Sequence, residues 1–242
     1  MGEIKRGILG GFSGRVGTVV GSTWKKVSYM RALALSVANP RTLPQQEQRT
    51  RFALTLAFLR TLTPYLRVGY KPQTQTRTAF NAAMSYNIRY ALTGEFPDIG
   101  VDYRRVMVAR GSLTPVFDVT VTKEDGKIAM AWTDNSGMGD AFATDLAMPL
   151  AYNKKRSLAV YDFAAATRGD AALELALPAD WGDDPVAVYL AFRSEDNRTV
   201  TNSICLLDEP YEGEDAGGGT GGDTGGTGGA GGDGNQGANP LG

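Results

Sequence analysis

The rhythm of residues 95–207 most constrains the fold of this chain, because short β-favouring runs follow one another there without a helix-sized gap. Turn-forming clusters such as 124–126 and 134–137 separate the runs at intervals of 8 to 16 residues. Seven or eight short strands at that spacing predict an antiparallel β-sandwich of the immunoglobulin or fibronectin type. The expected strands are residues 105–109, 116–122, 127–132, 145–152, 158–164, 172–177, 186–193 and 199–206.

The pattern of apolar side chains predicts which residues of these strands face the core. Every second residue from Val186 to Phe192 is a large apolar one, so we expect one face of that strand to point inward. Trp132 lies on an early strand, and we expect its ring to anchor the core as a buried tryptophan does in immunoglobulin-like folds.

Residues 7–31 combine small and β-favouring residues with glycines at positions 14, 17 and 21. This pattern predicts one or two β-hairpins. A phosphate-binding loop needs a Gly-Lys-Ser/Thr sequence that opens a helix, and none follows residues 10–17. We therefore interpret the glycines of that segment as turn residues.

Two helices are predicted between the hairpins and the strands. Apolar residues recur at helical spacing over residues 43–62, with an extension toward Val68, and again over residues 78–92. Thr42 and Gln45 match a capping box at the start of the first helix, and Pro64 is expected to end or kink it. Gly94 is expected to stop the second helix.

These patterns predict a mixed α+β, mostly β chain in three parts. Residues 1–100 form a basic β-hairpin plus two-helix module, residues 101–207 form the β-sandwich, and residues 208–242 form an acidic, Gly-rich tail. Beyond position 217 the tail consists almost entirely of Gly, Thr, Asp and Asn. Such a segment buries too little apolar surface to offset the entropy of ordering, so we expect it to be disordered.

Charge is strongly segregated along the chain, although the net charge is only −1. Residues 1–110 carry a net charge of +12, residues 111–207 carry −6 and residues 208–242 carry −7. A basic half joined to an acidic half favours either nucleic acid as a partner or self-association between unlike halves. Solvation of the outer helix faces is the alternative explanation. The residues expected to contact a nucleic acid or a protein partner are Arg15, Lys25, Lys26, Arg31, Arg41, Arg49 and Arg51.

The absence of histidine excludes several chemistries. Ser-His-Asp and Cys-His triads cannot form, and neither can His-ligated zinc or haem sites. The single cysteine, Cys205, excludes an intrachain disulfide and any multi-cysteine cluster, and we expect it to be a buried structural thiol. We predict no catalytic, cofactor-binding or metal-ligating residue, and we expect a non-enzymatic protein.

Acidic clusters leave a weaker alternative open. Asp134, Asn135, Asp140 and Asp145 could offer oxygen atoms to Ca²⁺, but the EF-hand spacing is absent, and turn chemistry is the preferred interpretation. Carboxylate pairs such as the one at 183–184 occur in any acidic β-protein and do not by themselves indicate a glycosidase. The basic run 154–156 is interpreted as a solvated turn.

Targeting signals are not evident in the sequence. Glycine, serine and arginine interrupt the apolar residues of 8–20, so no signal peptide is predicted, and no 18-residue apolar run predicts a membrane span. We expect a cytoplasmic or virion location by default.

Three segments carry a resemblance to a known family. They are residues 7–25, the run Asn39-Pro40-Arg41-Thr42 and residues 131–137. Over about residues 1–207 the chain resembles a family of uncharacterised Bacteroidota proteins, and the run at 39–42 is more loosely similar to phage-associated and mobile-element proteins. The resemblance implies a prokaryotic or phage origin. It carries no catalytic residue to this chain, because the family has no assigned activity.

The leading functional hypothesis is a structural or protein-interaction component that self-associates or binds a protein partner, as in a virion or a surface assembly. A nucleic-acid-binding protein that uses the basic module is the alternative. A third hypothesis is a carbohydrate-binding module that uses Tyr152, Tyr161 and Trp181 as exposed sugar platforms.

Overall fold

The computed structural model describes residues 3–4, 12–24, 27–34, 36, 41–124 and 126–211 of the chain. The predicted tail beyond Tyr211 lies outside the described residues. By compactness the chain divides into two units, residues 1–50 and residues 51–242. The domain limits that we predict near residues 100 and 207 stay predictions, because compactness does not measure independent folding.

The first unit contains the predicted hairpins. Its strands form one antiparallel sheet in the order β1-β2-β3-β4. Their bounds are β1 (Glu3–Ile4), β2 (Phe12–Val16), β3 (Val19–Trp24) and β4 (Val27–Ala32). Gly17 lies in the turn between β2 and β3 with a φ angle of 58°, which confirms its interpretation as a turn glycine. Gly14 also has a positive φ angle of 99°, but it lies within strand β2 opposite Gly21, so its interpretation as a turn residue is wrong.

Three α-helices follow, one more than the sequence predicts. They are α1 (Leu43–Thr61), α2 (Thr63–Gly69) and α3 (Ala79–Tyr90), with a 3₁₀ turn η1 (Lys71–Gln73) before α3. Helix α1 ends shortly before Pro64, as expected, but Pro64 lies in the first turn of a separate helix, α2, because proline fits that position. Thr78 caps α3, since its hydroxyl accepts the backbone N–H of Asn81 at 3.2 Å. No helix in the described part of the chain is long and apolar enough to cross a membrane.

The remaining residues form antiparallel sheets. Two long sheets have the orders β10-β9-β12-β13 and β11-β8-β7, and β5 pairs with β6. The bounds are β5 (Leu92–Thr93), β6 (Gly100–Val101), β7 (Phe117–Glu124), β8 (Lys127–Thr133), β9 (Leu146–Asn153), β10 (Leu158–Tyr161), β11 (Ala172–Ala176), β12 (Val186–Arg193) and β13 (Ile204–Asp208). The mixed α+β, β-rich class is therefore confirmed.

The predicted strand over residues 105–109 is wrong. The segment is buried at Val108 and Ala109, but side chains rather than a neighbouring strand satisfy much of its backbone. The Asn87 amide accepts the Met107 N–H at 2.9 Å and donates to the Met107 carbonyl at 3.0 Å. The Ser203 hydroxyl accepts the Val108 N–H at 2.9 Å. The alternating apolar residues of this segment correctly indicated that it is buried. A buried segment does not have to pair with a neighbouring strand, because side chains can satisfy its backbone N–H and C=O groups.

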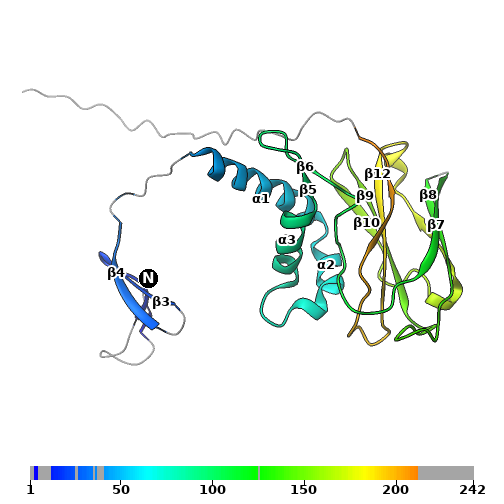
Figure 1. Ribbon diagram of the computed structural model, residues 1–242, viewed down its shortest axis with the longest axis horizontal. Coiled ribbons are helices and arrows are strands. Elements are labelled where there is room, and N and C mark those ends of the chain that lie inside the picture. Colours follow the sequence, from blue (N-terminus) through cyan, green and yellow to red (C-terminus); the bar gives the residue numbers. More distant parts are fainter. Residues whose placement is uncertain are drawn as a thin grey trace, which may run out of the picture. The chain divides into compact units, whose positions relative to one another are not determined.

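Strand β12 buries both of its faces, so the prediction of a single inward face is wrong. Ala187, Tyr189 and Ala191 belong to one hydrophobic cluster with the helices, and the alternate residues from Val186 to Phe192 belong to a second cluster with β8 and β11. Strand β9 divides between the two clusters in the same way. In Figure 1 the helices lie on one side of β9 and β12, and β7 and β8 lie on the other side. Continuous apolar sequence is what such doubly covered strands require.

Trp132 has the role that the sequence predicts. Its side chain is buried, and its ring meets the ring of Phe192 edge-on at a centroid distance of 5.2 Å. The indole N–H donates to the carbonyl of Arg168 at 2.9 Å, so the one polar atom of the ring is satisfied. Trp132 on β8 thus joins β12 to the turn that carries Arg168.

The helix–sheet cluster predicts a sharp difference between two leucines of α1. Leu59 is fully buried, whereas Leu56 is 37% exposed. We expect Leu59→Ala to lower the free energy of unfolding by about 2–5 kcal/mol, because it leaves a cavity in the cluster. The matched variant Leu56→Ala should cost about 0.5 kcal/mol. Urea unfolding followed by circular dichroism measures both, and equal losses would contradict the packing of α1 on the sheet.

Candidate functional site

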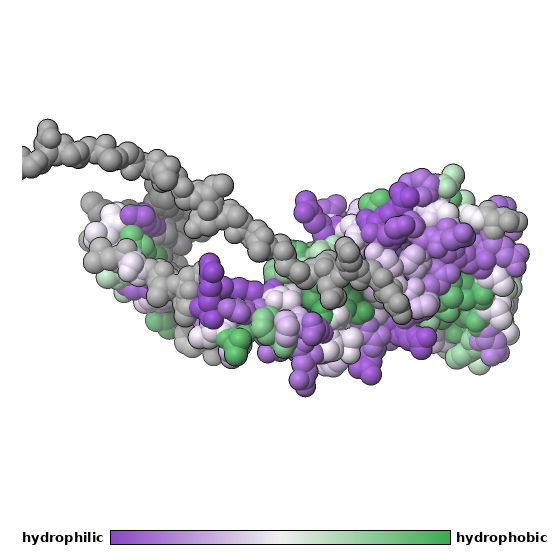
Figure 2. All heavy atoms as spheres, turned by 90° about the horizontal axis from the view of Figure 1, so that it is seen from above, coloured by the Kyte–Doolittle hydropathy of each residue, from purple (hydrophilic) through white to green (hydrophobic). Residues whose placement is uncertain are grey.

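The N-terminal sheet has one apolar face that is largely exposed within its own unit. The strand register places Val16 opposite Val19 and Val19 opposite Ala32, and Gly21 lies opposite Met30. Met30 is 70% exposed and Val16 is 53% exposed. The residues that share this face are Phe12, Gly14, Val16, Val19, Gly21, Thr23, Ser28, Met30 and Ala32, of which Thr23 and Ser28 are polar. We call this set the apolar face, and Figure 2 shows hydrophobic atoms at the surface of this unit.

Glycine is required at position 21 because Phe12 lies directly over it. A Cβ atom built on Gly21 would meet the Phe12 carbonyl oxygen at 2.2 Å and the Phe12 ring at 2.8 Å. The ring therefore covers the backbone of β3 instead of packing against a side chain. The result is a thin sheet with no second layer among the described residues of its unit.

The opposite face of the same sheet carries two arginines beside the exposed apolar residues Val27 and Tyr29. Arg15 lies opposite Val20, and Val20 lies opposite Arg31, so both guanidinium groups project from one side. The Arg15 Nε also donates to the Gly17 carbonyl at 3.1 Å. Strand spacing sets these two arginines about 10 Å apart across the sheet. We call this the basic face.

The other predicted contact residues come from elsewhere. Lys25 and Lys26 lie outside the described residues. Arg41 precedes α1, and Arg49 and Arg51 lie within that helix and make contacts of their own. Of the predicted set, the structure therefore brings together Arg15 and Arg31.

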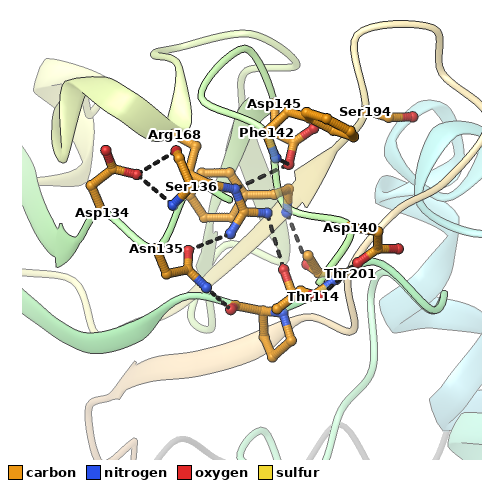
Figure 3. Close-up of polar contacts among 12 residues, drawn as sticks. Thr114, Asp134, Asn135, Ser136, Asp140, Phe142, Asp145, Arg168, Ser194 and Thr201 are labelled. Carbon is orange, nitrogen blue, oxygen red and sulfur yellow. Dashed lines mark hydrogen bonds and ion pairs between the residues drawn. The ribbon is translucent and has the colours of Figure 1, made fainter. Parts of the chain in front are cut away.

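Arg168 forms a buried clamp between three segments of the second unit. Its Nε donates to Asp145 Oδ2 at 3.0 Å, and neither side chain is more than 1% exposed. Its two terminal nitrogens donate to Asn135 Oδ1 at 2.8 Å and to the Thr114 carbonyl at 3.0 Å. Figure 3 shows the guanidinium group between these partners. Each arm of the planar group is satisfied, which a buried charge requires.

The acidic residues considered for Ca²⁺ have structural partners instead. Asp134 accepts the hydroxyl and the backbone N–H of Ser136, and Asp140 accepts the hydroxyl and the backbone N–H of Thr114. These hydrogen bonds lower the pKa values of both carboxyl groups below their usual range. The described residues contain no group of three or more His, Cys, Asp or Glu side chains arranged to hold a metal ion.

The basic run 154–156 is a turn, but it is not simply solvated. The Lys154 side chain is only 4% exposed, pairs with Asp208 at 2.5 Å and donates to the Glu209 carbonyl. Its ammonium group also lies 4.6 Å from the centroid of the Tyr103 ring. The interpretation of Lys154 as a solvated residue is therefore wrong. Asp208, expected to begin the tail, ends strand β13.

Asp184 is the centre of a neighbouring ionic cluster. Arg156 Nε donates to its carboxylate at 2.7 Å, the Asn153 amide at 3.1 Å and the Lys155 ammonium at 3.0 Å. These hydrogen bonds, that of Arg156 first, hold the pKa of Asp184 well below its usual range. These contacts join Asp184 to the β9–β10 connection.

The aromatic residues expected to bind sugars are mostly core residues. Tyr152 and Trp181 are each 3% exposed, so their expected exposure is wrong, and Tyr161 is half-buried. Tyr152 packs against Phe58 at a ring distance of 4.7 Å. Cys205 is half-buried, and burial raises the pKa of its thiol to about 11. That shift disfavours the thiolate that a nucleophile needs, in line with a structural thiol.

Sequence reasoning missed a cavity of about 350 Å³ beside α3. Three arginines line it, Arg77, Arg89 and Arg110, together with tyrosines that include Tyr86 and Tyr90. A signal was present in α3, because Ala82, Tyr86 and Arg89 recur at helical spacing and share one face. Arg77 and Arg110 come from separate segments, and only the tertiary fold brings them to that face.

Comparison with known proteins was made against families, curated proteins and solved structures. A family of unknown function, DUF6266, matches residues 11–207. The chain belongs to this family. The DUF6266 match spans strands β2 to β4, the helices and nearly all of the later sheets, and it confirms the resemblance to an uncharacterised family. No curated protein and no solved structure matches the chain.

The buried clamp predicts a large cost for losing one partner. We expect Arg168→Met to lower the free energy of unfolding by about 3–5 kcal/mol, because Asp145 would remain buried without its counter-charge. The matched change Arg198→Met removes an arginine that is 84% exposed beside Asp196 and should leave stability unchanged. Urea unfolding at neutral pH compares the two variants. An equal loss of stability in both variants would contradict a specific stabilising role for the buried Arg168–Asp145 pair.

The ionic cluster predicts a contribution to acid sensitivity. The folded state lowers the pKa of Asp184 below the ordinary value of 3.8, so its stabilising effect is complete above that pH and is lost as the pH falls. We expect Asp184→Asn to lower stability at about pH 6 and to lose less stability than the wild type between about pH 6 and pH 3. Urea unfolding at the two pH values measures this. If the wild type and Asp184→Asn lost equal stability between the two pH values, Asp184 would not contribute to the acid sensitivity.

Proposed function

We propose that this protein is a non-enzymatic assembly component, of the kind found in a virion or at a cell surface, whose apolar face packs against a second copy of the chain. The observation that carries this proposal is the exposure of Val16, Val19 and Met30 on a sheet with no second layer among the described residues of its unit. Exposed contiguous apolar surface of this kind marks interaction sites in soluble proteins.

Elementary energetics supports a need for a partner. A small sheet is stable only when one face packs against another layer, and the apolar face is the side suited to packing. Burial of apolar surface stabilises association by about 25 cal/mol per Å². Pairing two such faces would give each sheet the second layer that it lacks.

Two further features favour a second copy as the partner. Strand β4 is the edge of the described sheet, and all six of its residues are exposed, so its backbone can pair with another strand. In addition, residues 1–110 carry +12 whereas residues 111–242 carry −13, so unlike parts of two copies attract each other.

For the second unit we propose the immunoglobulin- or fibronectin-like sandwich that the sequence predicts. Strands β7 to β13 number seven, as that architecture requires, and they divide into sheets of three and four. In the strand lettering of immunoglobulin folds, the sheet β11-β8-β7 corresponds to strands E, B and A. In the sheet β10-β9-β12-β13, the last three strands correspond to C, F and G, and β10 is the strand that lies between C and E in the sequence. The shared hydrophobic cluster of the two sheets, with Trp132 and Phe192 in contact, supports face-to-face packing.

A charge placed on the apolar face tests the assembly proposal. We expect the full chain to form oligomers in multi-angle light scattering and Met30→Lys to shift the mass to that of the monomer. Tyr29→Lys is the matched control, because Tyr29 is the preceding residue of β4 and lies on the basic face. It should preserve the oligomer. A wild-type protein that stays monomeric at high concentration would overturn the proposal, and loss of the oligomer in both variants would mean that the face is not specific.

Nucleic-acid binding is the second candidate function, supported by Arg15 and Arg31 on the basic face. Contacts to phosphates weaken steeply with salt because bound counterions are released. We expect duplex DNA to bind at low salt in a filter assay and the double variant Arg15→Gln/Arg31→Gln to reduce the salt slope by about 2. Unchanged binding in that variant, or no binding at low salt, would remove this candidate.

A further inference from the structure

The arginine-lined cavity of the second unit is the feature that neither the assembly proposal nor the fold explains. It lies beside α3 and the α2–η1 connection, at the end of the segment 106–110. Its volume of about 350 Å³ falls in the range of small-molecule sites. Arg77, Arg89 and Arg110 line it with the three tyrosines Tyr70, Tyr86 and Tyr90. No acidic residue is among its lining residues.

The positive charge of this cavity has no internal compensation among the described residues. No ion pair between described residues includes Arg77, Arg89 or Arg110. The surrounding sequence is also free of acid, because residues 48–94 contain no Asp or Glu. Elsewhere in the second unit the exposed cations Lys127 and Arg198 each have a carboxylate partner. Three arginines that converge on one hollow without a carboxylate define a site for an anion.

Backbone and side-chain contacts hold the site in place before any ligand arrives. The Arg110 N–H donates to the Gly69 carbonyl at 2.8 Å, which fixes the segment against the end of α2. A Cβ atom on Gly69 would meet the Val108 carbonyl oxygen at 2.6 Å, so glycine is needed for this close approach. The amide of Asn87 and the hydroxyl of Tyr70 both bind Met107, the latter at 3.0 Å. Arg110 is therefore presented by a rigid segment.

Aromatic rings supply a second kind of contact. The Arg110 guanidinium lies 5.0 Å from the centroid of the Tyr86 ring, and the Tyr86 and Tyr90 rings are 4.8 Å apart. Tyr90 is 51% exposed, so part of its ring is available to a ligand. Planar organic groups stack on such rings, whereas a bare inorganic ion gains nothing from them.

We propose that this cavity binds a small phosphate ester, with the phosphate held by Arg77, Arg89 and Arg110 and the organic part against Tyr86 and Tyr90. The guanidinium fork matches the spacing of phosphate oxygens and donates two parallel hydrogen bonds. The ring pair favours an ester with a planar group, as in a nucleotide. This site belongs to the second unit and the apolar face to the first, and the site does not rest on the assembly proposal.

Isothermal titration calorimetry of the full chain tests the site with three probes: adenosine monophosphate, inorganic phosphate and adenosine. We expect saturable binding of adenosine monophosphate, weaker binding of inorganic phosphate and none of adenosine. Arg89→Gln should weaken the binding of adenosine monophosphate about tenfold, since it removes charge-assisted hydrogen bonds. The matched change Arg60→Gln alters the net charge equally at a residue that does not line the cavity, and it should leave the affinity within about twofold.

Each other result overturns the proposal. No binding of adenosine monophosphate at millimolar concentration would exclude the site, and equal weakening by Arg60→Gln would reduce it to a general charge effect. Equal affinities for adenosine monophosphate and inorganic phosphate would exclude the role of the rings. Arg89 and Tyr90 are exposed, so Tyr90→Leu serves as a second folded variant that should weaken adenosine monophosphate but not inorganic phosphate. Light scattering of Arg89→Gln should show the wild-type mass, which separates this site from the assembly surface.

Discussion

Strand β12 buries both of its faces, and the packing of the whole second unit depends on this strand. Ala187, Tyr189 and Ala191 on one side pack against the helices. The alternate residues on the other side, Val186, Val188, Leu190 and Phe192, pack with β8 and β11. The helices are therefore not an appendage of the sheets, because their buried residues share a core with β9 and β12. This packing also fixes where α3 lies, and α3 in turn carries most of the arginine-lined cavity. The cavity lies beside α3 and the segment 106–110, both of which contribute buried residues to this shared core.

Much of the fold could be predicted from sequence because local signals were strong. The hairpin glycines, the proline at position 64 and the alternation of β7 and β8 each specify local geometry directly. Where prediction failed, the deciding contacts were tertiary. Segment 105–109 looked like a strand, but Asn87 and Ser203 satisfy its backbone from elsewhere in the chain. Likewise, the alternation of β12 suggested one buried face because small residues such as Ala187 are weak indicators of burial.

Site prediction was limited in the same way. Counting charges along the chain identified a basic half, but the basic half divides between two very different settings. Arg15 and Arg31 project from a thin sheet, whereas Arg77, Arg89 and Arg110 surround a hollow that includes Tyr86. Sequence separation hid the second group, since Arg110 and Arg77 are far apart along the chain. Of the acidic residues considered for Ca²⁺, Asp145 is the partner of the buried Arg168, because a charge in the interior needs a counter-charge.

The clamp of Arg168 and Asp145 has a consequence for how the molecule responds to its surroundings. A guanidinium group keeps its charge throughout the physiological range, and no histidine is present to titrate between about pH 5 and pH 8. The side-chain charges that stabilise the interior of the second unit are therefore nearly constant across neutral compartments. Ionic strength, which screens exposed arginines over about 8–10 Å, is the variable to which such a molecule is sensitive. An assembly built from it would loosen or tighten with the concentration of salt, and would be indifferent to mild acidification.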